Sequence, residues 1–224
     1  MKNIITFLLF TIALQLNAQR TIDTQVGDFN EIKVFDLIEV NLIQSNENRI
    51  VIKGENVSDI NWINKEGVLK LRMQLDKKFR GEDTFIEVYY TDIDVIDANE
   101  GSQITCNELV KKNKIELRAQ EGARINIGMD VAVAEIRAVT GGIIQASGLA
   151  ENQTVVLNTG GIFEGSDLRT AVSEIKIQAG GEAEVFASER VDINLKAGGD
   201  VVVYGNPKVV NKKTFAGGRI RILD

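Results

Sequence analysis

The feature that most constrains the fold is a repeat of about 19 residues in the C-terminal half of the chain. Five segments carry a pair of glycines between short stretches of alternating apolar and polar residues, and two less regular copies precede them. Self-similarity at such a period is typical of a protein built from stacked repeats. The recurring glycines, spaced by 18 to 21 residues, are Gly101, Gly122, Gly142, Gly161, Gly181, Gly199 and Gly218.

The alternation around each glycine pair predicts strands with one buried face. In one copy, Ile136 and Ala138 precede the pair and Ile144 and Ala146 follow it, with a polar residue inside each couple. Successive side chains of a strand point to opposite sides, so each couple faces one core. The glycine pair would form the turn, where a positive φ or the lack of a Cβ is needed. Later copies repeat the pattern at Val155/Leu157, Phe163/Gly165, Ile175/Ile177, Ala183/Val185, Ile193/Leu195, Val201/Val203 and Ile220/Ile222.

This spacing predicts an all-β parallel β-helix, or β-solenoid, with about seven clear coils in residues 93–223. Two or three short strands per repeat cannot form an independent sheet, but equivalent strands of successive copies can pair at about 4.8 Å. The alternative is a β-sandwich of hairpins. Its usual two-residue turns, Asn-Gly and Asp-Gly, are absent from the sequence.

Before the repeats, residues 19–95 form a more variable β segment, either an N-terminal cap or irregular first coils, and residues 96–224 are the regular repeats. No linker rich in Pro, Gly or Ser separates the two parts, so we expect one continuous body. Solenoid ends need capping, because they expose unpaired strand edges.

Residues 1–18 have the three parts of a signal peptide: Lys2, an apolar run, and a small residue before the predicted cut at Gln19. The apolar run is shorter than the roughly 20 residues of a membrane span, although an uncleaved anchor is the alternative. No second apolar segment follows, so we expect no integral membrane span. The predicted location is the periplasm, the outer-membrane surface or the extracellular space.

Composition excludes several function classes. The formal charge is −6 with scattered Lys and Arg, which argues against a nucleic-acid partner. The sequence contains no histidine, so imidazole-based triads and metal sites are excluded. Cys106, the single cysteine, occupies a strand position equivalent to Ile127 one coil later and is expected to be a packed core thiol rather than a nucleophile. We therefore predict a protein that is not an enzyme, with no catalytic, cofactor-binding or metal residues.

Two sets of residues are compatible with other functions, one enzymatic and one sugar-binding. A polysaccharide lyase or glycosidase would need clustered carboxylates. A sugar-stacking platform could use Trp62 and the Tyr89-Tyr90 pair, although alternation predicts that one tyrosine is in the core. The carboxylates, which we interpret as outward-facing strand residues, are Asp92, Asp94, Asp97, Glu164, Glu182, Glu184 and Asp200.

Over residues 28–223 the chain resembles the bacterial "head GIN domain" family, described as auto-transporter adhesins. The resemblance rests on FNEIKVFDLIEVNLIQS, VLKLRM and YTDIDVIDANEGSQI, and above all on the ending VVVYGNPKVVNKKTFAGGRIRI. It implies a right-handed parallel β-helix, export, and no established enzymatic activity. The chain departs from the family name, because its length leaves no room for a membrane pore.

These observations predict an exported, non-enzymatic β-solenoid that acts as an adhesin-like binding module of the cell envelope. Its partner would be a glycan or an envelope or surface protein, and no cofactor is expected. A purely structural envelope protein is the main alternative. Neither the ligand nor the oligomeric state is indicated by the sequence.

Overall fold

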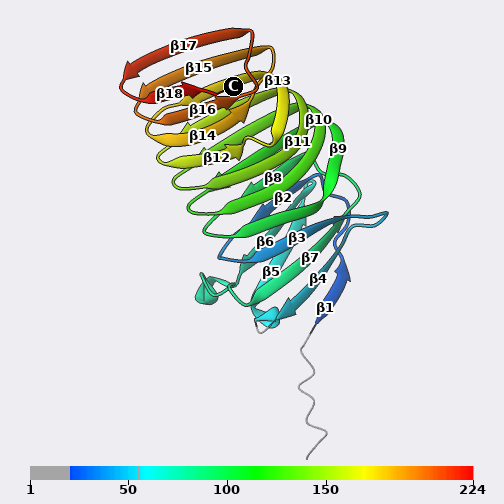
Figure 1. The fold of residues 1–224 in the computed structure, drawn as a ribbon. Coiled ribbons are helices and arrows are strands. Elements are labelled where there is room, and N and C mark those ends of the chain that lie inside the picture. The colour runs from blue at the N-terminus through cyan, green and yellow to red at the C-terminus, as the bar shows by residue number, and fades with distance from the viewer. Residues whose placement is uncertain (1–20, 55, 224) are drawn as a thin grey trace, which may run out of the picture.

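The computed structural model describes residues 21–54 and 56–223, and the predicted signal peptide lies outside these residues. The described chain forms eighteen strands that wind into one coiled stack (Figure 1). Most strands pair in parallel with the equivalent strand of the neighbouring coil. The predicted β-solenoid with coils of about 19 residues is therefore confirmed.

The N-terminal strands are β1 (Ile22–Gln25), β2 (Glu31–Val34), β3 (Glu39–Gln44), β4 (Arg49–Gly54), β5 (Ile60–Lys65), β6 (Val68–Met73) and β7 (Thr84–Tyr90), with short 3-10 helices η1 (Val57–Asp59) and η2 (Leu75–Lys77). The coils continue with β8 (Val95–Ala98), β9 (Gln103–Gln120), β10 (Arg124–Val139), β11 (Ile143–Asn158), β12 (Gly161–Gly165) and β13 (Leu168–Ile177). The last strands are β14 (Gly181–Phe186), β15 (Arg190–Ala197), β16 (Asp200–Tyr204), β17 (Val209–Ala216) and β18 (Arg219–Ile222).

The first regular coils differ from the expected short strands. Each of β9, β10 and β11 is one continuous strand of 16 to 18 residues that follows the coil around its corner. The parallel ladder between β10 and β11 runs from Arg124 to Val139, so pairing with the next coil continues through the bend. In later coils the strand is divided, as between β12 and β13.

The core lies inside the coils and is lined as alternation predicts. Every predicted inward residue from Ile136 to Val203 is buried, and Ile220 and Ile222 in the last strand are half-buried against the core. On β17 the inward positions opposite Ile193 and Leu195 hold Lys212 and Thr214, which are exposed. The apolar column thus ends in polar side chains at the last coil.

The turns align differently from the glycine spacing read in the sequence. Gly122 N donates to Thr140 O at 3.2 Å, and Gly141 N donates to Thr159 O at 3.1 Å. Gly101 and Gly122 are therefore equivalent to Gly141, the first glycine of its pair, and not to Gly142.

The N-terminal segment contains both coil strands and antiparallel edge strands. β2 pairs in parallel with both β6 and β8, and β3 pairs with both β7 and β9, so residues 31–44 stack between two segments that follow them in sequence (Figure 1). β4 lies antiparallel to β1 and β7, and β5 lies antiparallel to β6. No feature of the sequence alone indicated this order of stacking.

Candidate ligand-binding face

One side of the solenoid carries a column of uncharged polar side chains, which we call the amide column. It consists of Asn41 on β3, Thr105 on β9, Asn126 on β10 and Gln145 on β11. Each is the direct cross-strand partner of the next, so the side chains are about 4.8 Å apart. Asn126 and Gln145 are exposed, and Thr105 is half-buried.

The surface is hollowed at both ends of the amide column. A hollow of about 390 Å³ lies over β3, β7 and the start of β9, and one of about 430 Å³ lies over β10, β11, β12 and β14. The first is lined by Glu39, Asn41, Phe85, Glu87, Gln103, Thr105 and Asn107, among others. The second is lined by Asn126, Gln145, Ser147, Glu164, Ser166, Asp167 and Glu184, with Ala146 at its base.

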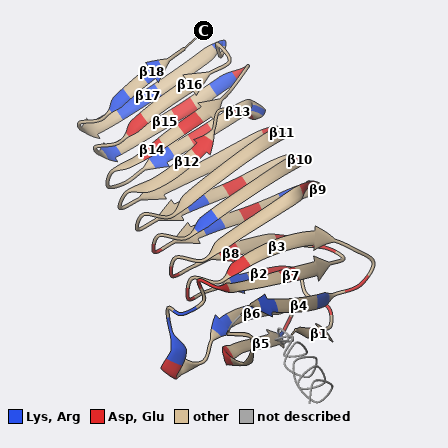
Figure 2. Ribbon diagram, turned by 60° about the horizontal axis from the view of Figure 1, so that its bottom comes forward, with Lys and Arg blue, Asp and Glu red and all other residues tan. Residues whose placement is uncertain are grey.

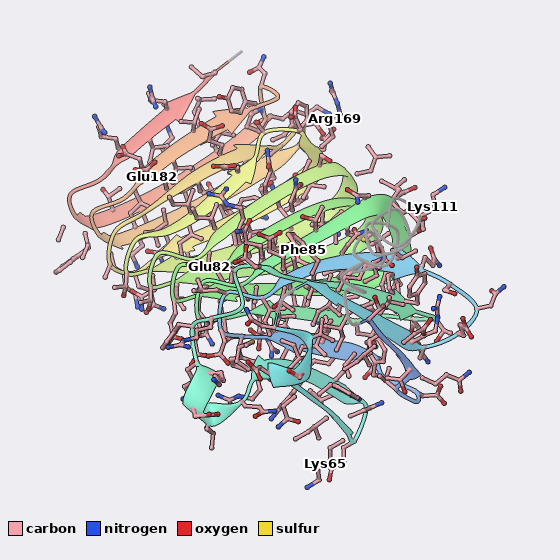
Figure 3. The ribbon with its side chains drawn as sticks, turned by 90° about the horizontal axis from the view of Figure 1, so that it is seen from below. Lys65, Glu82, Phe85, Lys111, Arg169 and Glu182 are labelled. Atoms are coloured by element: carbon pink, nitrogen blue, oxygen red, sulfur yellow. The ribbon has the colours of Figure 1, made fainter. Side chains whose placement is uncertain are left out.

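Phe85 supplies an exposed apolar ring beside the first hollow. It is the outward residue of β7 opposite Glu39, and 52% of its surface is accessible. Figure 3 labels Phe85 on β7 and Glu82 in the loop that precedes this strand. An exposed ring next to amide and hydroxyl groups can pack against an apolar ligand surface while the polar groups bind its edge.

The side formed by β2, β8, the C-terminal parts of β9, β10 and β11, and β13 is different, and we call it the charged face. Here neighbouring outward residues form ion pairs along the strand. Glu31 and Lys33 are 2.9 Å apart, and the Glu116–Arg118 and Glu174–Lys176 pairs are each 2.7 Å apart. The charges of this face neutralise one another.

The four side chains of the amide column are uncharged, whereas the hollows at its two ends also contain carboxylates such as Glu39 and Glu164. Figure 2 shows β11 almost entirely in the colour of uncharged residues, and Glu151 is the single charged residue of that strand. Within the column and its flanks, Asn107 Nδ2 donates to Asn41 Oδ1 at 2.9 Å. The exposed amides of Asn126 and Gln145 can both donate and accept hydrogen bonds.

The structure brings together four of the carboxylates considered for catalysis. Glu164 lies opposite Glu184, and Glu182 lies opposite Asp200 on the next coil. Asp200 accepts two hydrogen bonds from Arg219, at 2.6 and 2.9 Å, and these hold the pKa of its carboxyl below the ordinary value. Among residues 21–54 and 56–223, no three acidic, His or Cys side chains are arranged to hold a metal ion.

The other three carboxylates bind lysines. Asp92 and Asp94 both accept hydrogen bonds from the ammonium group of Lys112, which also donates to the carbonyl of Ile93. These contacts lower the pKa of Asp94. Asp97 lies 3.4 Å from the Lys33 ammonium. The three aspartates thus fasten the junction between the N-terminal segment and the first regular coils.

The aromatic candidates do not form a common platform. Tyr90 is buried and Tyr89 faces outward, with the Arg49 guanidinium 4.2 Å from its ring centre. Trp62 lies on β5, which pairs with β6 rather than with β7, and packs partly against the core.

The thiol of Cys106 is in the core. Cys106 lies opposite Ile127, and its Sγ is 3.9 Å from the Tyr90 hydroxyl. Burial raises the pKa of the Cys106 thiol, which keeps it in the unreactive protonated form.

The amide column was missed in the sequence because the glycines were aligned on the wrong member of the pair. Counted from Gly101, Gly122 and Gly141, the fourth residue onward is Thr105, Asn126 and Gln145. This alignment would have revealed the same kind of uncharged side chain at one position of three successive coils. Asn41 and Phe85 carry no such signal, because they belong to the irregular N-terminal segment.

Comparison with known proteins gives one family and several similar structures. The family described as "Putative auto-transporter adhesin, head GIN domain" matches residues 28–207. A "putative adhesin" from Bacteroides fragilis NCTC 9343 superposes with a TM-score of 0.85 at 18% identity, covering 92% of this chain and 98% of that one.

Two structures from Parabacteroides distasonis ATCC 8503 share the same fold. A "putative adhesin" has a TM-score of 0.75 at 19% identity, covering 91% of this chain and 96% of its own. A "Putative lipid binding protein" has a TM-score of 0.71 at 16% identity, with coverages of 93% and 98%. None of the curated proteins compared with the chain matches it. In the described part of the chain, no helix has the length and apolar character of a membrane span.

Proposed function

Because the chain belongs to the head GIN domain family, we propose that it is an exported, non-enzymatic, adhesin-like binding module of the cell envelope. The amide column is its binding surface. The observation that carries this assignment is the repetition of uncharged hydrogen-bonding side chains at Thr105, Asn126 and Gln145 on three successive coils, between two hollows.

The ligand that fits this surface is an extended, uncharged glycan lying along the solenoid axis. Sugar hydroxyls donate and accept hydrogen bonds, as do the side-chain amides of Asn and Gln. A pyranose of an extended β-linked glycan advances by nearly the same distance as one coil, about 4.8 Å. Successive sugars would therefore meet equivalent side chains, and Phe85 would pack against the apolar face of a terminal sugar.

The test is glycan-array binding by a variant of the amide column and a matched variant of the charged face. We expect Asn126→Ala with Gln145→Ala to reduce binding by tenfold or more, since the loss of two hydrogen bonds at about 1 kcal/mol each has that effect. Glu135→Ala with Thr154→Ala changes outward residues of the same two strands on the charged face and should bind like the parent.

The dependence of binding on ionic strength and on oligosaccharide length tests whether the ligand is an uncharged glycan. An uncharged glycan should bind equally from low to high ionic strength, because no charge pair is screened. Affinity should rise with oligosaccharide length until the column is covered. Equal loss in both double variants, or capture of an envelope protein but no glycan through the same face, would contradict the glycan assignment.

A further inference from the structure

Two carboxyl groups meet at the turn that joins the N-terminal segment to the regular coils. Asp36 and Leu37 form the turn between β2 and β3, and Glu100 and Gly101 form the turn between β8 and β9. Leu37 N donates to Glu100 O at 3.0 Å, so the turns are stacked. All four residues have positive φ, between 51° and 72°. Asp36 is fully buried and Glu100 half-buried, and the register of β2 with β8 and of β3 with β9 places the two residues at equivalent positions of neighbouring coils.

Each of these carboxyl groups has an oxygen without a donor. Asp36 Oδ2 accepts a hydrogen bond from Met73 N at 3.1 Å. Within the described parts of the chain, Asp36 Oδ1 and Glu100 Oε2 are buried and accept none. Buried polar atoms are nearly always hydrogen-bonded, and a pair of adjacent buried carboxylates is strongly unfavourable.

The neighbouring cations do not donate hydrogen bonds to these two carboxyl oxygens. Arg72 Nε on β6 is 3.9 Å from Asp36 Oδ2, too far for a hydrogen bond, and the guanidinium lies over the Phe35 ring at 5.5 Å. Lys78, which follows η2, acts on Glu100 through its charge. Burial is the main cause of a raised pKa at Glu100, and Asp36 adds to it, while Lys78 and Arg72 oppose it.

We propose that Asp36 and Glu100 form a proton-binding site at the stacked turns, in which Glu100 keeps its proton and the two carboxyl groups share it in a hydrogen bond. The protonated Glu100 donates to the Asp36 carboxylate, one oxygen of which receives no hydrogen bond within the described parts of the chain. The charge of Asp36 opposes ionisation of Glu100.

The shared proton holds together the beginnings of three strands. β3 starts at Glu39, just after Asp36, and β9 starts at Gln103, just after Glu100. Gly81 N donates to Asp36 O at 3.2 Å, which fixes the end of the loop that leads into β7 at Thr84. The fit is tight, since a Cβ on Gly81 would lie 2.4 Å from Asp36 O.

These three strands line the hollow that holds Phe85 and Asn41. The shared proton therefore regulates the shape of one end of the binding surface, a consequence that rests on the proposed function, whereas the proton site itself does not. Loss of the proton places two charges in the buried turn and loosens all three strand beginnings.

The direct test is a carboxyl ¹³C NMR titration of the whole protein. Glu100 should titrate above the ordinary glutamate pKa of about 4.3. In Asp36→Asn, whose amide can donate to Glu100, the pKa of Glu100 should fall toward the ordinary value. Glu121→Gln changes the equivalent turn residue of the next coil and should leave the Glu100 titration unchanged. An ordinary pKa at Glu100, or a displacement of the titration by millimolar Ca²⁺ that indicates a cation between the carboxyls, would overturn the proposal.

A second variant keeps the proposal testable where Asp36→Asn does not fold. Above the ordinary pKa, folded protein retains a proton that the unfolded chain has released, so the stability of the parent falls as pH rises until the raised pKa of Glu100 is passed. Glu100→Gln, which always carries a donor, should lack this fall. Parallel curves for parent and variant would exclude the proton site. Glu100 could show the expected titration while the parent and Glu100→Gln bind ligand with the same affinity over that pH range. In that case only the link between the proton site and the binding surface is wrong.

Discussion

Phe163 and Gly165 show how single residues fill the core of the solenoid. The two are inward neighbours on β12, and the Phe163 ring lies where a Cβ of Gly165 would be, at 2.3 Å. The largest and smallest inward residues thus share one space, and Phe163 is fully buried. Total volume along a strand, rather than the size of each residue, satisfies the close packing of a protein interior.

At this scale we predict that Leu195→Ala costs about 2–5 kcal/mol in the free energy of unfolding, because it leaves a cavity at a fully buried position. Chemical denaturation of the purified protein measures this cost. Lys176→Ala, an outward change on the neighbouring strand β13, should stay within about 0.5 kcal/mol. Similar costs for both changes would mean that the side chains at these positions do not have the orientation described.

At the scale of the turn, the two glycines of the Gly141-Gly142 pair are required for different reasons. The first, Gly141, adopts a positive φ, as does the single glycine Gly122 at the equivalent position of the preceding coil, and an added Cβ at either would meet nothing within 4 Å. The second, as at Gly142, has no positive φ, but a Cβ there would lie 2.1 Å from Ala119 O in the preceding coil. One glycine permits the turn and the other permits two coils to touch.

This difference in role predicts different stability costs for substitutions at the two kinds of glycine. Gly142→Ala should cost about 3 kcal/mol, at the upper end of ordinary substitutions, because backbone must move to admit the methyl group. Gly122→Asn should cost about 1 kcal/mol or less, since Asn tolerates positive φ and meets no neighbour. Thermal unfolding of the two variants provides the comparison, and the reverse ranking would refute the assigned roles.

At the scale of the whole molecule, the stacking order departs from the chain order. Residues 31–44 pair with residues 95–106 on one side and with residues 68–90 on the other. The chain therefore forms β2 and β3 first, and it supplies their neighbours on both sides only after it has passed through β4 and β5. The antiparallel strands β1 and β4 then cover the edge of β7, which protects it from pairing with another chain.

Export also belongs to this scale and stays a prediction from the sequence. Mass spectrometry of the protein isolated from its host should find a mature N-terminus at or near Gln19. A chain that retains Met1 in the envelope fraction would contradict the predicted cleavage of residues 1–18.

The regular coils were predictable because their information is local and repeated. The alternation of Ile175, Lys176 and Ile177 predicts which side chains are buried, and the same pattern recurs about every 19 residues. The burial of Cys106, and of one tyrosine of the Tyr89-Tyr90 pair, followed from the same rule. Parallel pairing then followed, since no single repeat can bury its own apolar face.

Only the tertiary structure decided what depends on residues far apart in the chain. Asp36 and Glu100 meet because the coil of residues 31–44 is inserted next to the coil of β8 and β9, and Phe85 joins the amide column by the same insertion. Alternation with a period of two residues determines which face of a strand each side chain occupies. It does not determine which other strand becomes the neighbour of that strand. That choice is made by the packing of the whole N-terminal segment.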